Sequence, residues 1–214
     1  MVAAIVVSVS AVACLLVAEW SGAKLVKVAA KMSAASAFLA MALACGALEW
    51  RYGQLLFAGL VLCWIGDACL LSSGRSKGFL AGIAAFLLGH VVYAIAFCQL
   101  GLNTTALFVS ALVLGGLAAA TLRWLRPYIP DDFRVPVFCY VGVISLMVTV
   151  SFAAYANGAS LLLPAGAFGF ALSDLFVARD RFVTKSFVNP GLGLPAYFGS
   201  QMLLAYTASS AVAT

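Results

Sequence analysis

The chain has 214 residues, of which 65% are hydrophobic and 9% charged, and its formal net charge is +5. A soluble domain carries roughly 25% charged residues, so this composition excludes one and indicates an integral membrane protein. The positive charge does not favour nucleic-acid binding, because the basic residues are spread over several short connections.

Long apolar runs recur along the chain, each near the roughly 20 residues that cross a bilayer. We predict eight membrane-spanning helices, in chain order at 2–18, 28–48, 55–72, 79–100, 106–122, 135–156, 161–178 and 192–212. The predicted fold is therefore all-α, a polytopic membrane bundle that forms one integral membrane domain over residues 1–214.

The basic residues fall almost entirely on one side of this topology. Eleven of the twelve lysines and arginines lie at the first, third, fifth and seventh connections: Lys24, Lys27, Lys31, Arg75, Lys77, Arg123, Arg126, Arg134, Arg179, Arg181 and Lys185. Positive residues gather on the cytoplasmic side of a membrane. We therefore expect these connections in the cytoplasm and both termini outside. The Ala-, Val- and Gly-rich composition favours a bacterial inner membrane.

A carboxylate interrupts the third span, at Asp67 in "LCWIGDACLL", and residues 55–71 contain no other charge. An aspartate at the centre of a spanning helix costs about 2.5–3.5 kcal/mol. The same pattern recurs at Asp174 in "FGFALSDLFVA" of the seventh span. Two such residues predict a functional cavity rather than hydrogen bonds that only join helices.

Further polar residues are predicted to face the same cavity. They are Lys31 of the second span, His90 and Tyr93 of the fourth, Ser173 of the seventh, and Tyr197 and Gln201 of the eighth. With the predicted topology, both aspartates, Lys31 and Tyr197 fall in the cytoplasmic half, and His90 and Gln201 lie nearer the midplane. Two alternatives stay open: Lys31 can extend to the membrane surface, and His90 can be a structural histidine.

The two aspartate segments also resemble each other. "AGLVLCWIGDACLL" at 58–71 aligns without a gap to "AGAFGFALSDLFVA" at 165–178, an offset of 107 residues (67 to 174). The alignment predicts two four-helix repeats, 1–107 and 108–214, that share one orientation in the membrane. At this offset His90 corresponds to Tyr197, or to Gln201 if the last connection is four residues longer.

Several other kinds of site are not indicated. The six cysteines lie within the spans and show neither CxxC nor Cys/His spacing, so neither a disulfide framework nor a zinc site is predicted. We expect no metal and no cofactor.

Four segments together resemble a known family: "AGLVLCWIGDACLL", "KGFLAGIAAFLLGHVVYAIAF", "GAFGFALSDLFVARDRFV" and "YFGSQMLLAY". They are similar to the successive motifs of the YhhN-type lysoplasmalogenases, which are membrane proteins with eight predicted spans. The shared elements are Gly66–Asp67, the GHxxY segment from Gly89 to Tyr93, Ser173–Asp174 and Gln201. The resemblance implies hydrolysis of the vinyl ether bond of lysoplasmalogens to a fatty aldehyde and glycerophosphocholine or glycerophosphoethanolamine.

This chemistry suits two carboxyl groups. Protonation of the vinyl ether β-carbon gives an oxocarbenium ion, which water captures as a hemiacetal that then collapses. The reaction needs one protonated carboxylic acid and one carboxylate, as glycosidases use for a related cation. Asp67 and Asp174 are the predicted catalytic pair, and the sequence leaves open which of them is the acid and which is the carboxylate. Five polar residues are predicted to contact the substrate: His90, Tyr93, Ser173, Tyr197 and Gln201. Lys31 and the basic connections are predicted to bind its phosphate.

A second function remains open on the sequence. Paired intramembrane acids in duplicated halves also suit a proton-coupled small-molecule transporter. The expected partners are a lysophospholipid substrate and membrane lipids, with no nucleic acid. The headgroup preference and the oligomeric state are left open.

Overall fold

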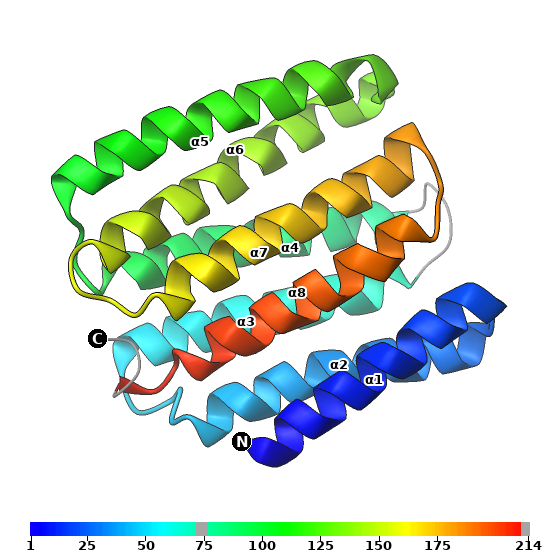
Figure 1. Cartoon of the computed structure of the whole chain (residues 1–214), viewed down its shortest axis with the longest axis horizontal. Coiled ribbons are helices and arrows are strands. Elements are labelled where there is room, and N and C mark those ends of the chain that lie inside the picture. Colours follow the sequence, from blue (N-terminus) through cyan, green and yellow to red (C-terminus); the bar gives the residue numbers. More distant parts are fainter. Residues whose placement is uncertain (72–76, 211–214) are drawn as a thin grey trace.

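The computed structural model describes residues 1–71 and 77–210 of the chain (Figure 1). The described residues form the helices α1 (Val2–Ser21), α2 (Lys24–Ala44), α3 (Arg51–Leu70), α4 (Lys77–Cys98), α5 (Thr104–Leu125), α6 (Asp131–Tyr155), α7 (Leu162–Ala178) and α8 (Val188–Tyr206). A 3-10 turn, η1 (Arg126–Tyr128), follows α5, and a π-helical turn, η2 (Arg179–Val183), follows α7. The predicted all-α helical bundle is confirmed.

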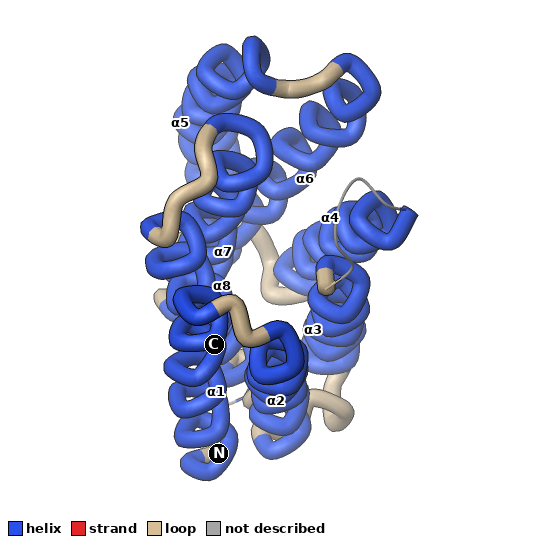
Figure 2. The backbone as a smooth tube through the Cα atoms, turned by 90° about the vertical axis from the view of Figure 1, so that its right-hand side faces the viewer, coloured by secondary structure: helices blue, strands red, loops and turns tan. Residues whose placement is uncertain are grey.

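Seven of the described helices are long and apolar enough to cross a membrane. The remaining helix, α8, is 19 residues long and includes Asn189, Pro195 and Gln201 among its apolar residues. It packs along α7 and also against α2 (Figure 2). The eighth span therefore stays a prediction, which the place of α8 within the bundle supports.

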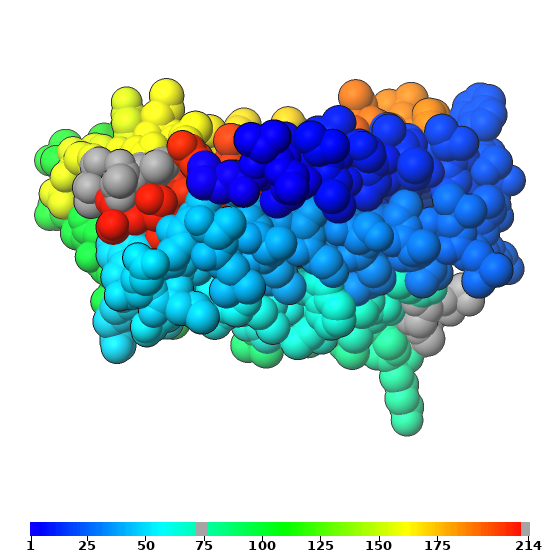
Figure 3. Space-filling view, turned by 90° about the horizontal axis from the view of Figure 1, so that it is seen from below, coloured from blue at the N-terminus to red at the C-terminus, as the bar shows by residue number. Residues whose placement is uncertain are grey.

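Six helices form a closed ring when the bundle is viewed end-on (Figure 2). The order around the ring is α2, α3, α4, α6, α7 and α8, and α8 returns to α2. Outside the ring, α1 packs mainly on α2 and α8, and α5 packs mainly on α6. Figure 3 shows α1 and α2 covering much of one face of the molecule. The ring places residues of α2, α3, α4, α6, α7 and α8 toward a shared interior.

Most helices begin a few residues before the apolar runs that predicted them. The fifth begins at Thr104, because the Asn103 side chain accepts a 2.9 Å hydrogen bond from the Ala106 amide and caps the helix. The sixth begins at Asp131, and two acidic residues in the first turn suit the positive end of the helix dipole. Hydropathy omits such polar first turns, so the predicted starts are late.

The connections are divided between the two ends of the bundle. At one end, the Trp50 indole donates to the Ala208 carbonyl at 2.7 Å, and Asn157 donates to the Leu100 carbonyl at 3.2 Å. At the other end, the Arg181 guanidinium lies 4.0 Å above the Phe79 ring. The basic residues named above lie at this second end, except Arg75, which is outside the described residues. The assignment of this end to the cytoplasm stays a prediction.

Two apolar clusters fill the bundle. The larger runs through the ring and includes Phe38, Leu60 and Phe170. The smaller, around Phe79 and Phe133, lies at the end with the basic residues, and Ala178 packs against it. On α7, Phe170 and Ala178 are eight residues apart, with Asp174 midway between them. The Asp174 carboxyl is therefore placed at the junction of the two clusters.

Candidate active site

Asp67 is buried on α3 and both of its carboxylate oxygens have partners. Lys31 Nζ of α2 lies 3.1 Å from Oδ1, and Tyr197 Oη of α8 donates a 2.6 Å hydrogen bond to Oδ2. The side chains of Lys31 and Asp67 are 12% and 2% exposed. A buried cation needs a counter-charge to offset its desolvation, so the pair explains how a lysine and an aspartate are both accommodated here.

The hydrogen bonds continue from Tyr197 toward the end of the bundle that lies opposite the basic residues. Gln201 Nε2 donates to Tyr197 Oη at 3.3 Å, and Tyr93 Oη donates to Gln201 Oε1 at 3.0 Å. We call Lys31, Asp67, Tyr93, Tyr197 and Gln201 the Asp67 cluster. Helices α2, α3, α4 and α8 each contribute to it, which makes it a continuous polar chain across four helices.

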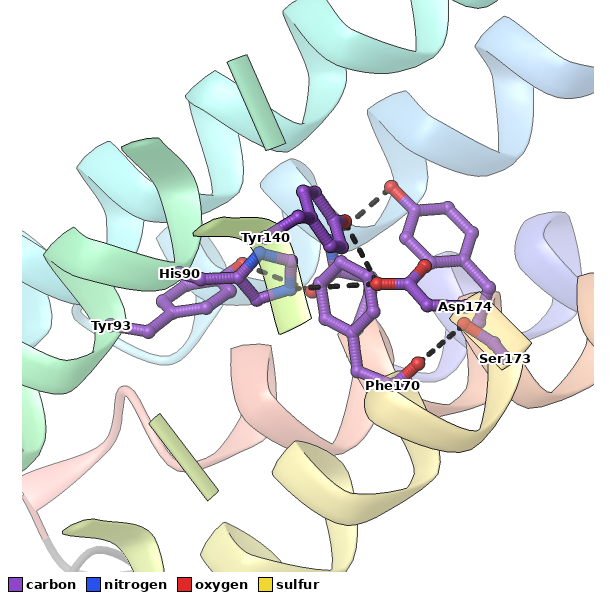
Figure 4. A network of polar contacts seen from close by, with 8 residues as sticks. His90, Tyr93, Tyr140, Phe170, Ser173 and Asp174 are labelled. Atoms are coloured by element: carbon purple, nitrogen blue, oxygen red, sulfur yellow. Dashed lines mark hydrogen bonds and ion pairs between the residues drawn. The ribbon is translucent and has the colours of Figure 1, made fainter. Parts of the chain in front are cut away.

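Asp174 lies in a second group, which we call the Asp174 cluster, with His90 and Tyr140 (Figure 4). Tyr140 Oη of α6 donates a 2.8 Å hydrogen bond to Asp174 Oδ2. His90 Nε2 of α4 lies 3.9 Å from the same oxygen, which is beyond hydrogen-bond distance. The Asp174 side chain is 20% exposed. The Asp174 side chain is therefore less enclosed than that of Asp67, which is 2% exposed.

His90 is fully buried, and within residues 1–71 and 77–210 neither ring nitrogen has a partner in hydrogen-bonding geometry, although the Phe86 backbone, one turn earlier on α4, approaches the ring. Its ring is enclosed by Phe170, at 4.6 Å between ring centroids, and by the edge of Tyr140, at 5.2 Å. Leaving a buried polar group unpaired costs about 1–3 kcal/mol. Such an arrangement at a carboxyl group is typical of a site that accepts a ligand or a water molecule.

An aromatic contact joins the two clusters. The Phe170 ring packs against His90 on one side and against Tyr197, at 5.1 Å, on the other. Phe86 of α4 lies edge-on to Tyr197 at 5.9 Å and to Phe170 at 6.3 Å. The sequence predicts one convergent set of polar residues, whereas the structure divides it into two groups around an apolar centre.

Glycines bring the site helices close together. A Cβ atom added at Gly66 of α3 would lie 2.7 Å from the Phe86 ring, and one at Gly59 would lie 2.5 Å from the Tyr93 ring. Across α7 and α8, a Cβ atom at Gly166 would lie 2.8 Å from Leu204, and one at Gly169 would meet Ser200. A side chain at any of these positions would force a neighbouring residue to shift, so the glycines permit the close spacing of α3 against α4 and of α7 against α8.

The two clusters are built from helices that correspond in the predicted repeat. The aspartates lie on α3 and α7, 107 residues apart, and the same offset relates His90 on α4 to Tyr197 on α8. Each of these two side chains faces the aspartate of the other half. In addition, α2 contributes Lys31 to the Asp67 cluster, and the corresponding helix α6 contributes Tyr140 to the Asp174 cluster. The repeat itself stays a proposal, and this arrangement supports it.

The YhhN family profile matches residues 3–208. The chain belongs to the YhhN family. It is similar to lysoplasmalogenase TMEM86A of Bos taurus, with 34% identity over 161 residues, and to lysoplasmalogenase TMEM86B of Homo sapiens, with 31% identity over 157 residues. These matches cover 72% and 73% of this chain and 64% of each relative, so the chain spans less than two thirds of their length. No solved structure matches the chain.

Within this YhhN-family chain, most predicted site residues enter one of the two clusters. Ser173 does not: its hydroxyl donates to the Phe170 carbonyl at 2.7 Å within α7. Lys31 is paired with Asp67, so we no longer assign it to the substrate phosphate. Tyr140 was not predicted, because a lone tyrosine in the apolar run "VFCYVGV" looks like a packing residue. The only feature that could have identified Tyr140 as a site residue is its position on α6, the helix that corresponds to α2 in the predicted repeat.

No group of three or more His, Cys, Asp or Glu side chains that could hold a metal ion occurs in residues 1–71 and 77–210. None of the six cysteines, all of which lie in the described residues, forms a disulfide. The donors of the candidate site are thus carboxyl, hydroxyl, amide, imidazole and ammonium groups, which suit proton transfer and hydrogen bonding.

Proposed function

We propose that this YhhN-family protein hydrolyses the vinyl ether bond of lysoplasmalogens, releasing a fatty aldehyde and a glycerophosphocholine or glycerophosphoethanolamine. The curated relatives are named lysoplasmalogenases. The observation that carries the proposal is the pair of carboxyl groups inside an apolar bundle, one closed and ion-paired, the other partly exposed.

The reaction proceeds through a cation, and the two carboxyl groups supply what it requires. One carboxylic acid transfers its proton to the vinyl β-carbon, which leaves an oxocarbenium ion. Water adds to the neighbouring carbon, and the resulting hemiacetal collapses to aldehyde and alcohol. General acid catalysis of this kind contributes typically about 10²–10⁴-fold. A carboxylate nearby stabilises the cation, and its effect is large because the site is apolar.

His90 is the residue best placed to hold the attacking water. Its Nε2 lies 3.9 Å from Asp174 Oδ2, while Tyr197 and Gln201 are occupied by bonds within the Asp67 cluster. In this proposal His90 Nε2 and the Asp174 carboxyl share the water between them. Tyr197 and Gln201 then hold Asp67 rather than contact the substrate.

The headgroup is proposed to lie at the basic end of the bundle. Arg179 and Arg181 of η2 follow Asp174 by five and seven residues, or roughly 7–10 Å along a helix. Arg179 Nη1 donates to Asn189 Oδ1 at 2.6 Å, which anchors η2 to the start of α8. In a lysoplasmalogen the vinyl ether lies only a few bonds from the phosphate, so one molecule spans both places. We place this end in the cytoplasmic leaflet of a bacterial inner membrane.

The test is aldehyde release by the purified full chain in detergent, from defined lysoplasmenyl-choline and lysoplasmenyl-ethanolamine. Aldehyde and the glycerophospho product should form in equal amounts. A Tyr52→Phe variant, whose altered residue bonds Thr207 outside the two clusters, should release aldehyde at the wild-type rate. Absence of aldehyde with intact lipid would refute the proposal. Proton-coupled flux in vesicles without cleavage would instead establish the transporter.

A further inference from the structure

We propose that the two aspartates have fixed and different roles: Asp174 donates the proton, Asp67 stays ionised, and Tyr140 is the residue that positions Asp174. This inference rests on the proposed vinyl ether hydrolysis and assigns the roles that the sequence leaves open.

Asp67 is unsuited to proton donation because its surroundings require a negative charge. One oxygen faces the Lys31 ammonium and the other accepts the Tyr197 hydroxyl. Both partners bring hydrogen atoms to the carboxylate, and the ammonium charge beside Oδ1 favours its ionised form. With its side chain 2% exposed, Asp67 also offers no face to a substrate. It acts on the reaction through its charge.

Asp174 differs in each of these respects. The hydrogen bonds of the described residues engage only Oδ2, and no lysine or arginine among those residues pairs with the carboxyl. A neutral acid can therefore carry its proton on Oδ1. The side chain is 20% exposed, so that proton can meet a lipid that approaches the bundle.

Tyr140 fixes the direction of the Asp174 carboxyl. Its hydroxyl donates to Oδ2 at 2.8 Å, which holds this oxygen toward α6 and turns Oδ1 the other way (Figure 4). Its ring stands edge-on to His90, so the same side chain sets the distance between His90 and Asp174. Tyr140 is a positioning residue, because its hydroxyl acts on the carboxyl and not on the lipid.

The proton cycle balances within this cluster. The Asp174 proton bonds to the vinyl β-carbon with the electron pair of the double bond, leaving a carboxylate and an oxocarbenium ion. Water held at His90 bonds to the cationic carbon, and its proton passes to the Asp174 carboxylate. This restores the acid, which then protonates the glycerol oxygen as the C–O bond breaks, while the hemiacetal hydroxyl returns its proton to the Asp174 carboxylate and becomes the aldehyde carbonyl. Asp67 remains a carboxylate throughout.

The first test compares Tyr140→Phe with the matched control Tyr52→Phe, which also removes the hydroxyl of a tyrosine hydrogen-bonded inside the bundle. Tyr140→Phe should lower kcat about tenfold, on the order of one hydrogen bond, with KM within about twofold. The control should keep both constants while its thermal midpoint falls. An unchanged kcat in Tyr140→Phe would overturn the positioning role.

The second test separates the aspartates by chemical rescue. Formate can take the place of a deleted acid only where the carboxyl can be reached. Added formate should raise the turnover of Asp174→Ala at least about tenfold, part of the general-acid contribution, and leave Asp174→Asn and Asp67→Ala unchanged. Rescue of Asp67→Ala instead would reverse the assignment. A wild-type protein that releases no aldehyde would refute the proposed function and this inference together, whereas active wild type without rescue of Asp174→Ala refutes the inference alone.

Discussion

Tyr197 donates a 2.6 Å hydrogen bond to Asp67, and this bond joins the last described helix, α8, to α3. The corresponding side chain on α4, His90, lies 3.9 Å from Asp174, which is beyond hydrogen-bond distance. Corresponding helices thus place both carboxyl groups, but the Asp67 carboxylate is enclosed and the Asp174 side chain is partly exposed. The two carboxyl groups also differ in their other partner, which is the Lys31 ammonium for Asp67 and the Tyr140 hydroxyl for Asp174.

Replacing either aspartate by asparagine should nearly abolish turnover. Asp67→Asn and Asp174→Asn should each lower kcat by at least about 10²-fold, the scale of a lost acid or charged partner. The fold should survive, because asparagine is nearly isosteric. Aldehyde release per milligram of folded protein measures this. Near-normal turnover in either variant would remove that residue from the mechanism.

The Lys31–Asp67 pair should be strongly coupled in stability. Lys31→Met and Asp67→Asn each leave one buried partner alone and should lower the free energy of unfolding by about 3 kcal/mol, whereas the double variant should lose less than the sum. Thermal unfolding in detergent gives the comparison.

The same helix offers the control. Lys27→Met breaks the more exposed pair with Glu19, at 2.7 Å, and should change the free energy of unfolding by less than about 1 kcal/mol. Equal effects at the two lysines would contradict the strong pairing of Lys31.

Replacing His90 by phenylalanine should raise the stability of the protein and lower its activity. In His90→Phe the unpaired nitrogens are replaced by carbon within an aromatic cage, so the thermal midpoint should rise by about 2–4 °C for each kcal/mol gained. Turnover should fall at least about tenfold, because water would lose its partner. Scanning calorimetry and aldehyde assays on one preparation test both. A less stable variant with normal turnover would show a purely structural histidine.

The lipid preference follows from the close packing of α3 on α4 and of α7 on α8. The glycine contacts leave no width between these pairs for a second tail, so lysoplasmalogen should be strongly preferred to intact plasmalogen. An ester-linked lysolipid should bind without cleavage, because it has no alkene carbon to protonate. The three lipids are assayed with one headgroup and one detergent. Comparable cleavage of plasmalogen would contradict the narrow site, and fatty acid release from the ester would contradict the protonation step.

The topology can be tested with single cysteines in a background that lacks the six native ones. Lys185→Cys, in the connection before α8, should react with an impermeant thiol reagent only after the cell is opened. Asn157→Cys, between α6 and α7, should react in intact cells whose outer barrier is permeabilised. Both positions are exposed. A third suitable position, Ser73, lies outside the described residues. The reverse pattern would place the site in the outer leaflet.

Hydropathy is sufficient to find the helices of this fold because each contains one long apolar run. It misplaces their starts where capping or charge decides them, as at Asn103 and Asp131. It also assigns α8 as a span, although its asparagine, glutamine and prolines make its composition marginal. The packing of α8 against α2 and α7 supports this prediction.

The candidate site was partly predictable because charge is conspicuous in an apolar span. Asp67 and Asp174 stand out for that reason, and helical spacing adds His90, Tyr197 and Gln201. What spacing does not give is which side chain faces which, since that depends on the order of helices around the ring. Tyr140 illustrates the limit: only the contact between α6 and α7 turns an ordinary apolar-run tyrosine into a partner of Asp174.

The Lys31–Asp67 pair also has a consequence for how the protein is made. Inserting a lone lysine or aspartate at the centre of a helix costs about 2.5–3.5 kcal/mol. Because α2 and α3 are consecutive, they can leave the translocon as one hairpin with the two charges already joined. Tyr197 arrives much later, on α8, and only then does Asp67 gain its second partner. On this route we expect the nascent chain to carry a neutralised but incomplete centre, because Asp67 lacks its second partner until α8 is in place.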